Sequence, residues 1–277
     1  MKYIAIMLVA VTACLVVGFG LALLLERILS RRLSAVQRVA LSALLGILAF
    51  AGVTALYLGR YYHASQRAID ALGGSPTVRV TQTGDGSLFD GPGANTLLVF
   101  LPGAKVDSRA YAPLMSSLAD GGVDCFLVDP PANVAFLAGG ALDRTLGGYR
   151  YDHLILAGHS LGGVMASSYA SSHPQQVDGL ALLASYTTKE LDDSVRVCTI
   201  YGSEDGVFDL AAYKDSLGLL PPNSQEVCIS GGNHANYGDY GSQDGDKPGT
   251  IGREEQQDIA KRAILDLAQA IAEADAA

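Results

Sequence analysis

The chain has 277 residues, enough for one large domain with an appendage or for two small domains. Residues 1–63 hold six of its 19 basic groups and one of its 28 acidic groups. The remaining residues, 64–277, therefore carry 13 basic groups against 27 acidic ones, a net charge of −14. This acidic part repels nucleic acid and anionic lipid headgroups, so we expect no nucleic-acid partner and no basic membrane-binding patch.

Two long stretches without charged side chains, Tyr3–Leu25 and Val39–Leu58, lie near the start of the chain. Each is long enough to cross a bilayer core as a helix, which takes about 20 residues. We therefore predict a membrane hairpin over residues 1–63, with spans at about 3–25 and 39–58. A cleaved signal peptide is the alternative for the first stretch, but its apolar run exceeds the roughly 7–15 residues of such a segment. Val11–Cys14 resembles a lipoprotein processing site, although cleavage there would leave an unexplained apolar tail.

The connection between the two apolar stretches is basic, because Glu26 is the only acid beside Arg27, Arg31, Arg32 and Arg38. Short loops rich in arginine tend to remain in the cytoplasm. Two spans would then place both chain ends outside. The sequence thus predicts a multi-pass protein of the cell membrane whose larger part is extracytoplasmic.

A polar linker is predicted over residues 64–76, because Gly73-Gly74-Ser75-Pro76 interrupts any helix that continues from the second span. The main domain is expected over residues 77–277. Val78–Gln82 alternates in hydrophobicity as an edge strand does, and a glycine-rich turn leads to a second short strand around 87–89. These two strands predict an antiparallel start to the domain.

Continuous apolar runs and helical segments alternate from residue 95 onwards, which is typical of a parallel sheet covered on both faces. The predicted strands are 96–101, 124–128, 153–157, 179–184, 195–201 and 226–230. Helices are predicted at 108–118, after Ser160, at 210–217 and at 253–272. The fold class is therefore α/β, with a mostly parallel sheet and helices on both faces. About ten residues separate the strands 179–184 and 195–201, which leaves no room for a cap domain.

A G-x-S-x-G motif follows the strand at 153–157 directly, in the order Gly158-His159-Ser160-Leu161-Gly162-Gly163. A serine on such a sharp strand-to-helix turn needs glycine two positions before and two after, because the backbone turns back on itself. The alternative is a glycine-rich turn without chemistry. The strand, turn and helix around Ser160 favour a catalytic nucleophile.

An activated serine requires an imidazole base, and the base requires an acid that orients it. In this setting the acid and then the histidine follow the serine in the chain, which leaves His173 and His234. His173 ends the serine's own helix, and a rise of about 1.5 Å per residue carries it away from Ser160. His234 follows the last strand and is the predicted base. Asp205, after the strand 195–201, is the predicted acid, with the adjacent Glu204 as the alternative.

Two backbone amides are predicted to bind the oxyanion that forms during acyl transfer, those of Leu161 and Ala104. Leu161 follows the nucleophile, and Ala104 lies in the loop after an earlier strand. Gly103 lets that loop expose the next N–H group, whereas Pro102 has none to donate. His159 is predicted to pack and to form hydrogen bonds rather than to catalyse.

No metal or cofactor is expected. The four cysteines show neither a disulfide framework nor metal-ligand spacing. Asp239, Asp244 and Asp246 lie close together in a glycine-rich loop and could hold calcium, but their spacing matches no defined loop. A solvated acidic turn explains them equally well.

Four segments together resemble the α/β-hydrolase superfamily over about residues 77–272: 101–104, 158–163, 202–205 and 232–234. Within it the chain looks like a small, capless branch of membrane-attached bacterial proteins. The resemblance implies an α/β-hydrolase fold and a serine hydrolase. The chain departs from lipases in having Pro102 where they begin a His-Gly segment, and in lacking a lid insertion.

The leading hypothesis is a membrane-anchored serine hydrolase that cleaves a small-molecule or lipid-like carboxylic ester with Ser160, His234 and Asp205. An acyltransferase, a thioesterase or an amidase could use the same triad. A non-catalytic binding domain is the alternative from another class. Such a domain is expected to lack a member of the triad, and none is missing here.

Overall fold

The computed structural model describes residues 2–30, 32–93, 95–137 and 139–275. It divides into two compact units, Met1–Arg60 and Tyr61–Ala277, which are described separately. The first unit consists of α1 (Lys2–Ile28) and α2 (Ala35–Gly59). Both helices are long and apolar enough to cross a membrane, over Val11–Ile28 and Ala35–Leu56. Arg31, one of the four arginines in the predicted cytoplasmic loop, lies outside the described residues.

The two helices of the first unit pack closely through small residues. A Cβ atom on Gly18 would lie 2.4 Å from the backbone oxygen of Ser42, so only glycine permits this approach. Near the connection, Arg38 donates a hydrogen bond of 2.7 Å to the Glu26 carboxylate. Only 11% of the stretch Val11–Ile28 and 6% of Ala35–Leu56 are buried. Their apolar side chains are therefore exposed, unlike those of a helix in the core of a soluble protein. The two helices could therefore cross a membrane.

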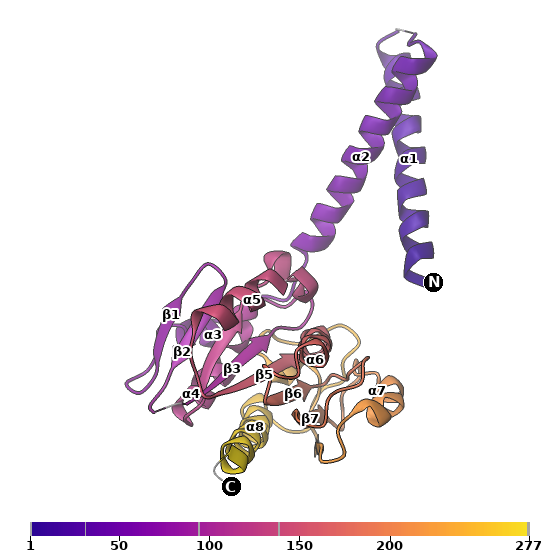
Figure 1. Ribbon diagram of the computed structural model, residues 1–277. Coiled ribbons are helices and arrows are strands. Elements are labelled where there is room, and N and C mark those ends of the chain that lie inside the picture. The colour runs from indigo at the N-terminus through magenta and orange to yellow at the C-terminus, as the bar shows by residue number, and fades with distance from the viewer. Residues whose placement is uncertain (1, 31, 94, 138, 276–277) are drawn as a thin grey trace. The chain divides into compact units, whose positions relative to one another are not determined.

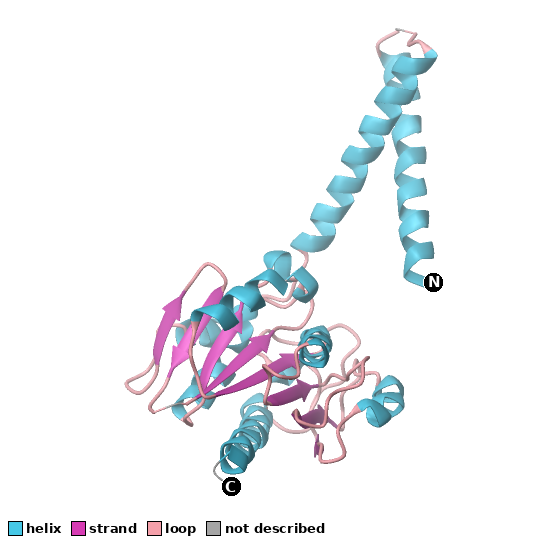
Figure 2. Cartoon of the chain, in the orientation of Figure 1, coloured by secondary structure: helices cyan, strands magenta, loops and turns pink. Residues whose placement is uncertain are grey.

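The second unit is built on one eight-stranded sheet in the order β1-β2-β4-β3-β5-β6-β7-β8 (Figures 1 and 2). β2 pairs antiparallel with both β1 and β4, and the other neighbouring strands are parallel. The predicted fold class and the antiparallel start are confirmed. The strands are β1 (Arg79–Gln82), β2 (Gly86–Asp90), β3 (Thr96–Leu101), β4 (Asp124–Val128), β5 (His153–His159), β6 (Gly179–Leu183), β7 (Arg196–Gly202) and β8 (Gln225–Ile229).

Helices cover both faces of this sheet, and Figure 1 shows α8 on the face opposite α5 and α6. The α-helices are α3 (Gln66–Ala71), α4 (Ala112–Asp120), α5 (Gly139–Gly148), α6 (Leu161–Ser172), α7 (Leu210–Ser216) and α8 (Arg253–Asp275). Short 3-10 turns connect them: η1 (Ser108–Tyr111), η2 (Pro131–Asn133), η3 (Ala135–Leu137), η4 (Leu217–Leu219) and η5 (Ala235–Tyr237).

Alternate side chains of β3 enter two separate cores. Leu98 and Phe100 pack with residues of α4 and α8, whereas Leu97 and Val99 pack with residues of α5 and α6. All four are at most 3% exposed, and burying each contributes about 1.5–3 kcal/mol. The uninterrupted apolar run in β3 therefore reflects burial on both faces.

The segment expected to be a linker, residues 64–76, is part of the second unit and packs within it. Its helix α3 begins at Ser65, whose hydroxyl accepts the N–H of Ala68, and Ala68 is fully buried. Arg67 forms an ion pair of 2.9 Å with Asp239, a residue far away in the chain. A helix of six residues is too short for its sequence pattern to show a buried face, so the sequence suggested only a polar connection.

Candidate active site

Ser160 lies between β5 and α6 with φ 53° and ψ −124°, a conformation that side-chain-bearing residues rarely adopt. Two glycines make the turn possible. A Cβ atom on Gly158 would lie 2.4 Å from the backbone of Gly162, and one on Gly162 would lie 2.2 Å from the backbone oxygen of Leu101. The glycines on either side of Ser160 are therefore required by close backbone approach, as the sequence predicts.

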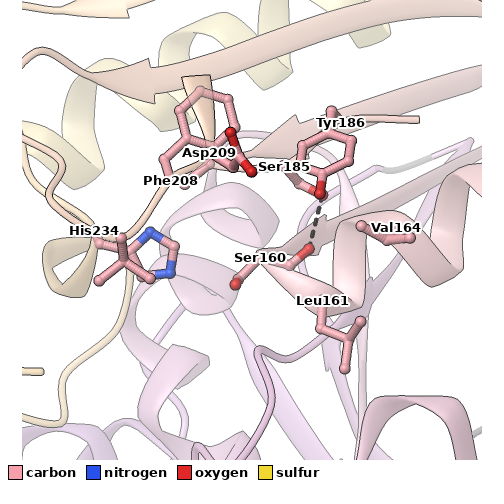
Figure 3. Close-up of a pocket in the computed structure, with 10 residues that line it drawn as sticks. Ser160, Leu161, Val164, Ser185, Tyr186, Phe208, Asp209 and His234 are labelled. Carbon is pink, nitrogen blue, oxygen red and sulfur yellow. Dashed lines mark hydrogen bonds between the residues drawn. The ribbon is translucent and has the colours of Figure 1, made fainter. Parts of the chain in front are cut away.

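Hydrogen bonds hold this strained turn in place. Ser160 donates its N–H to the backbone oxygen of Leu183 at 2.9 Å, and Ser185 donates its hydroxyl to the Ser160 backbone oxygen at 2.7 Å (Figure 3). Such a backbone conformation costs on the order of 1–3 kcal/mol and persists only when its surroundings support it. The Ser160 side chain is thereby presented to a pocket instead of packing into the core.

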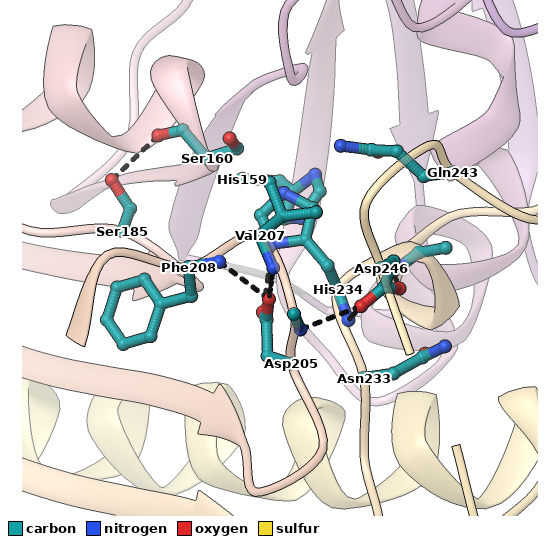
Figure 4. A network of polar contacts seen from close by, with 12 residues as sticks. His159, Ser160, Ser185, Asp205, Val207, Phe208, Asn233, His234, Gln243 and Asp246 are labelled. Atoms are coloured by element: carbon teal, nitrogen blue, oxygen red, sulfur yellow. Dashed lines mark hydrogen bonds and ion pairs between the residues drawn. The ribbon is translucent and has the colours of Figure 1, made fainter. Parts of the chain in front are cut away.

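Asp205 and His234 meet at the carboxyl ends of β7 and β8. The Nδ1 atom of His234 lies 2.8 Å from Oδ2 of Asp205, and the two side chains are only 1% and 2% exposed (Figure 4). Oδ1 of Asp205 accepts the N–H groups of Val207 at 2.8 Å and Phe208 at 2.7 Å. Because a carboxylate only accepts, Nδ1 of His234 carries the proton and Nε2 is left as the basic atom.

The basic atom of His234 is on the side of the nucleophile. Figure 3 shows the Ser160 side chain directed towards the His234 ring, and both residues line one pocket. Nε2 of His234 is buried and has no hydrogen-bond partner among the described residues. The structure thus places Ser160 and His234 on the wall of one pocket and Asp205 against the far side of the His234 ring.

The two alternative residues lie elsewhere. His173 stacks on Tyr169, with ring centroids 4.1 Å apart, and its Nδ1 contacts the Tyr169 backbone oxygen at 3.1 Å. His173 does not line the pocket that contains Ser160. Glu204 donates its backbone N–H to Gly232, and the adjacent Asp205 is the acid that contacts His234.

The loop after β3 leaves the Ala104 amide free between two residues that are fixed. Gly103 donates its N–H to the Tyr111 hydroxyl at 3.2 Å, and Lys105 donates to the backbone oxygen of Asn133 at 2.8 Å. In the part of the chain that the structure describes, the N–H of Ala104 has no partner. Leu161 begins α6, so its N–H has no partner within the helix either.

These two amides belong to backbone segments that touch each other. The position of a Cβ atom on Gly162 lies 2.2 Å from the Leu101 oxygen and 2.5 Å from the Pro102 oxygen, so the loop after β3 rests on the start of α6. Ala104 is exposed and Leu161 lines the pocket with Ser160. The loop that carries Ala104 therefore contacts the turn that carries Ser160, and the oxyanion role of the two amides stays a prediction.

His159 packs against His234 with ring centroids 4.4 Å apart, and its Nδ1 lies 2.8 Å from the Tyr111 hydroxyl. Burial lowers the pKa of His159 well below its usual value, and the electrostatic interaction with His234 lowers it further, so His159 is neutral. The predicted packing and hydrogen-bonding role of His159 is confirmed. No motif or spacing pointed to Tyr111, which joins His159 to the loop after β3.

Asp246 holds the loops that carry the acid and the base. Its carboxylate accepts the N–H groups of Gly206 at 3.0 Å, His234 at 3.2 Å and Ala235 at 2.9 Å. Asp239 is 1% exposed, so a solvated acidic turn was the wrong interpretation for this residue. Asp239 forms an ion pair with Arg67, and Asp246 accepts backbone N–H groups. These contacts occupy the carboxylates that the calcium hypothesis would use as ligands.

A pocket of about 200 Å³ opens beside the nucleophile. Its lining combines the apolar residues Val164, Ala184, Val207 and Phe208 with the polar residues Ser185, Tyr186 and Asp209. The volume is smaller than the roughly 300–1,000 Å³ usual for pockets that hold drug-sized ligands. It suits a small group attached to the reacting carbon.

Comparison with known proteins adds a family and a fold. A model of the alpha/beta hydrolase family matches residues 97–258, a region that contains Ser160, Asp205 and His234. A protein of Mycobacterium phage D29 named "Putative non-heme haloperoxidase" is 29% identical over 115 residues, 38% of this chain and 41% of that protein. The chain thus matches less than half the length of that relative.

Two solved structures share the fold of the second unit. A "predicted CIB-like hydrolase" from Thermoplasma acidophilum is 15% identical with a TM-score of 0.50, covering 70% of this chain and 100% of that one. TT1662 from Thermus thermophilus is 14% identical with a TM-score of 0.50, covering 70% and 98%. At this identity the similarity concerns the fold alone.

Proposed function

Because the chain belongs to the alpha/beta hydrolase family, we propose that it is a membrane-anchored serine hydrolase that cleaves carboxylic esters through an acyl-enzyme. The observation that carries this proposal is the buried pair of His234 and Asp205, whose free Nε2 atom faces the Ser160 side chain. The buried Asp205 carboxylate holds the proton on Nδ1 of His234 and leaves Nε2 basic, as a general base requires, whereas Nδ1 of the packing residue His159 contacts only the Tyr111 hydroxyl.

Each residue has a defined role in the proposed reaction. His234 takes the hydroxyl proton as Ser160 attacks the ester carbonyl, and Asp205 stabilises the imidazolium that forms. The amides of Ala104 and Leu161 bind the oxyanion of the tetrahedral intermediate. His234 then gives its proton to the departing alcohol, and a water molecule activated by the same imidazole releases the acid.

Labelling with a fluorophosphonate tests the proposed nucleophile. The full chain should be labelled, the Ser160→Ala variant should not, and a thermal unfolding midpoint unchanged within a few degrees should show that the variant folds. A variant that still becomes labelled would exclude Ser160 as the nucleophile. A panel of matched esters, thioesters and amides then separates an esterase from a thioesterase or an amidase, and added alcohols reveal acyl transfer.

The two apolar helices support membrane anchoring, and we propose that the second unit faces outwards. The arginines between the helices favour a cytoplasmic connection, so the substrates would be small-molecule or lipid-like esters met outside the cytoplasm. Protease treatment of intact cells that carry a tag after Ala277 tests this orientation. A tag that is fully protected until the membrane is broken would place the second unit in the cytoplasm and leave the proposed chemistry intact.

A further inference from the structure

The chain directly after α2 pairs with the loop that carries Ala104. Tyr62 donates its N–H to the backbone oxygen of Lys105 at 2.7 Å and accepts the N–H of Asp107 at 2.9 Å. The two bonds form a parallel bridge between Tyr62 and Val106. Tyr62, which lies three positions after the end of α2, therefore holds the backbone of Lys105 and of Asp107, on either side of Val106.

This pairing restrains a strained residue next to the proposed oxyanion donor. Lys105 has a φ of 59°, in the left-handed region that favours glycine. Its N–H is held by Asn133 and its backbone oxygen by Tyr62. If the bond to Tyr62 is lost, Lys105 can relax towards a negative φ, and the adjacent Ala104 amide changes its direction.

The side chain of Tyr62 reaches the other loop of the site. Its hydroxyl accepts the N–H of Asp244 at 3.0 Å, and its ring lies 5.7 Å from the ring of Tyr240. The same loop contains Asp246, which binds the backbone of His234. Tyr62 thus contacts the segment that carries the oxyanion donor and the segment that supports the base.

We propose that Tyr62 is a positioning residue of the active site, which fixes the Ala104 amide and the loop behind His234 relative to Ser160. This proposal rests on the proposed serine hydrolase function. It makes the membrane-proximal segment a part of the site, so a hydrolase domain that begins at residue 77 would lack one support of its oxyanion donor.

Steady-state kinetics of full-length variants in detergent test the proposal. Tyr62→Pro removes the N–H that binds Lys105, and we expect kcat to fall about 10- to 100-fold, below the 10²–10³-fold typical of deleting an oxyanion donor. Tyr62→Phe loses only the bond from Asp244, so a loss of about two- to fivefold is expected. KM should stay within about twofold, because the oxyanion forms only in the transition state.

His63→Ala is the matched control, because His63 is an exposed neighbour that contacts Tyr61 and neither loop of the site. It should keep the activity of the unaltered chain. Lys105→Gly removes the conformational penalty at that position, so adding it to Tyr62→Pro should restore part of the lost kcat. An effect of Tyr62 on general stability alone would not be rescued by a change at Lys105.

Amide hydrogen exchange separates this proposal from the proposed function. Exchange over residues 102–107 should be faster in Tyr62→Pro than in His63→Ala, whether or not the protein hydrolyses esters. Unchanged exchange, unchanged kcat in all Tyr62 variants, or a rise in KM alone would overturn the positioning role. If Tyr62→Pro fails to fold, Tyr62→Phe decides the question through kcat and through the exchange rate of the Asp244 amide, which should both change if the positioning role holds. Failure of the unaltered chain to react with a fluorophosphonate would instead overturn the proposed function.

Discussion

The turn around Ser160 and the loops around it are built in different ways. The turn is specified by a local motif, because Gly158 and Gly162 permit close backbone contacts that other residues would prevent, although Leu183 and Ser185 also hold it by hydrogen bonds. The loop after β3 is held by Tyr62 and Tyr111, and the loops after β7 and β8 by Asp246, none of which belongs to a motif. The position of the nucleophile is therefore marked in the sequence, whereas the supports of the groups that assist it are not.

This difference predicts where substitutions act. Changes in the turn and in the residues that exchange protons should abolish activity at once. Changes in the supporting residues should lower activity gradually, by moving groups that remain present.

Loss of the base should be as damaging as loss of the nucleophile. We expect His234→Ala to lower kcat on the order of 10⁴-fold or more, and the double variant with Ser160→Ala to be no worse, because triad members act as a unit. Ester turnover by the purified variants measures this. His173→Ala is the control and should keep its activity. If His173→Ala were the more damaging change, the base would be assigned wrongly.

Replacing Asp205 and Glu204, one at a time, by the corresponding amide should show from kcat which of the two is the catalytic acid. Asp205→Asn leaves an uncharged group beside His234 and is expected to lower kcat about 10⁴-fold, as loss of a tautomer-fixing carboxylate does. Glu204→Gln should change kcat less than about twofold, because its carboxylate does not contact the imidazole. The pair of kcat values decides the assignment, and the reverse ranking would make Glu204 the acid.

The supports of the site, unlike its nucleophile, could not be found in the sequence. Ser160 and the two glycines lie within five residues, so a motif specifies them, and the continuous apolar run of β3 specifies a strand buried on both faces. Asp246 bears no local sign of its role, since its partners Gly206 and His234 approach it only in the folded chain. Contacts of this kind have no sequence period and no fixed spacing.

Asp246 should therefore give an intermediate effect. Asp246→Ala removes the acceptor of four backbone N–H groups, those of Gly206 after β7, of His234 and Ala235 after β8, and of the adjacent Lys247, and bonds to charged groups contribute about 1.5–3 kcal/mol each. Water can bind some of the N–H groups that lose their acceptor, so we expect the free energy of unfolding to fall by about 2–4 kcal/mol. We also expect kcat to fall about 10-fold. Denaturant unfolding and ester turnover measure the two effects.

Asp244→Ala provides the matched control for that change. Asp244 lies in the same loop, but only its backbone N–H takes part in a described hydrogen bond, to Tyr62. It should leave both the unfolding free energy and kcat nearly unchanged. Equal effects of the two substitutions would mean that the negative charge of the loop matters and that the hydrogen bonds of Asp246 do not.

His159 lies where the turn and the loops meet, and it should make stability depend on pH. Its ring contacts His234, and through Tyr111 it reaches Gly103. Because burial lowers the pKa of His159 in the folded state, the unfolded chain binds a proton more readily as the pH falls through about 6.5. Stability is thus complete above that pH and decreases below it, by at most about 1.4 kcal/mol for each pH unit.

Replacing His159 by glutamine isolates this contribution from those of other titrating groups. A glutamine can still form a hydrogen bond with Tyr111, but it takes up no proton, so His159→Gln should unfold with a shallower pH dependence between pH 6.5 and 5. Tyr111 and Tyr237, which also surround the ring, do not titrate in this range because burial raises the pKa of both. Denaturant unfolding of the two proteins at pH 7.5 and 5 provides the comparison, and an equal loss of stability in both would show that His159 takes up a proton as readily in the folded protein as in the unfolded chain. A shallower pH dependence of stability, together with nearly unchanged kcat at pH 7.5, would make His159 a supporting residue of the site. It would then act like the residues that hold the loops, although it is the direct neighbour of the nucleophile.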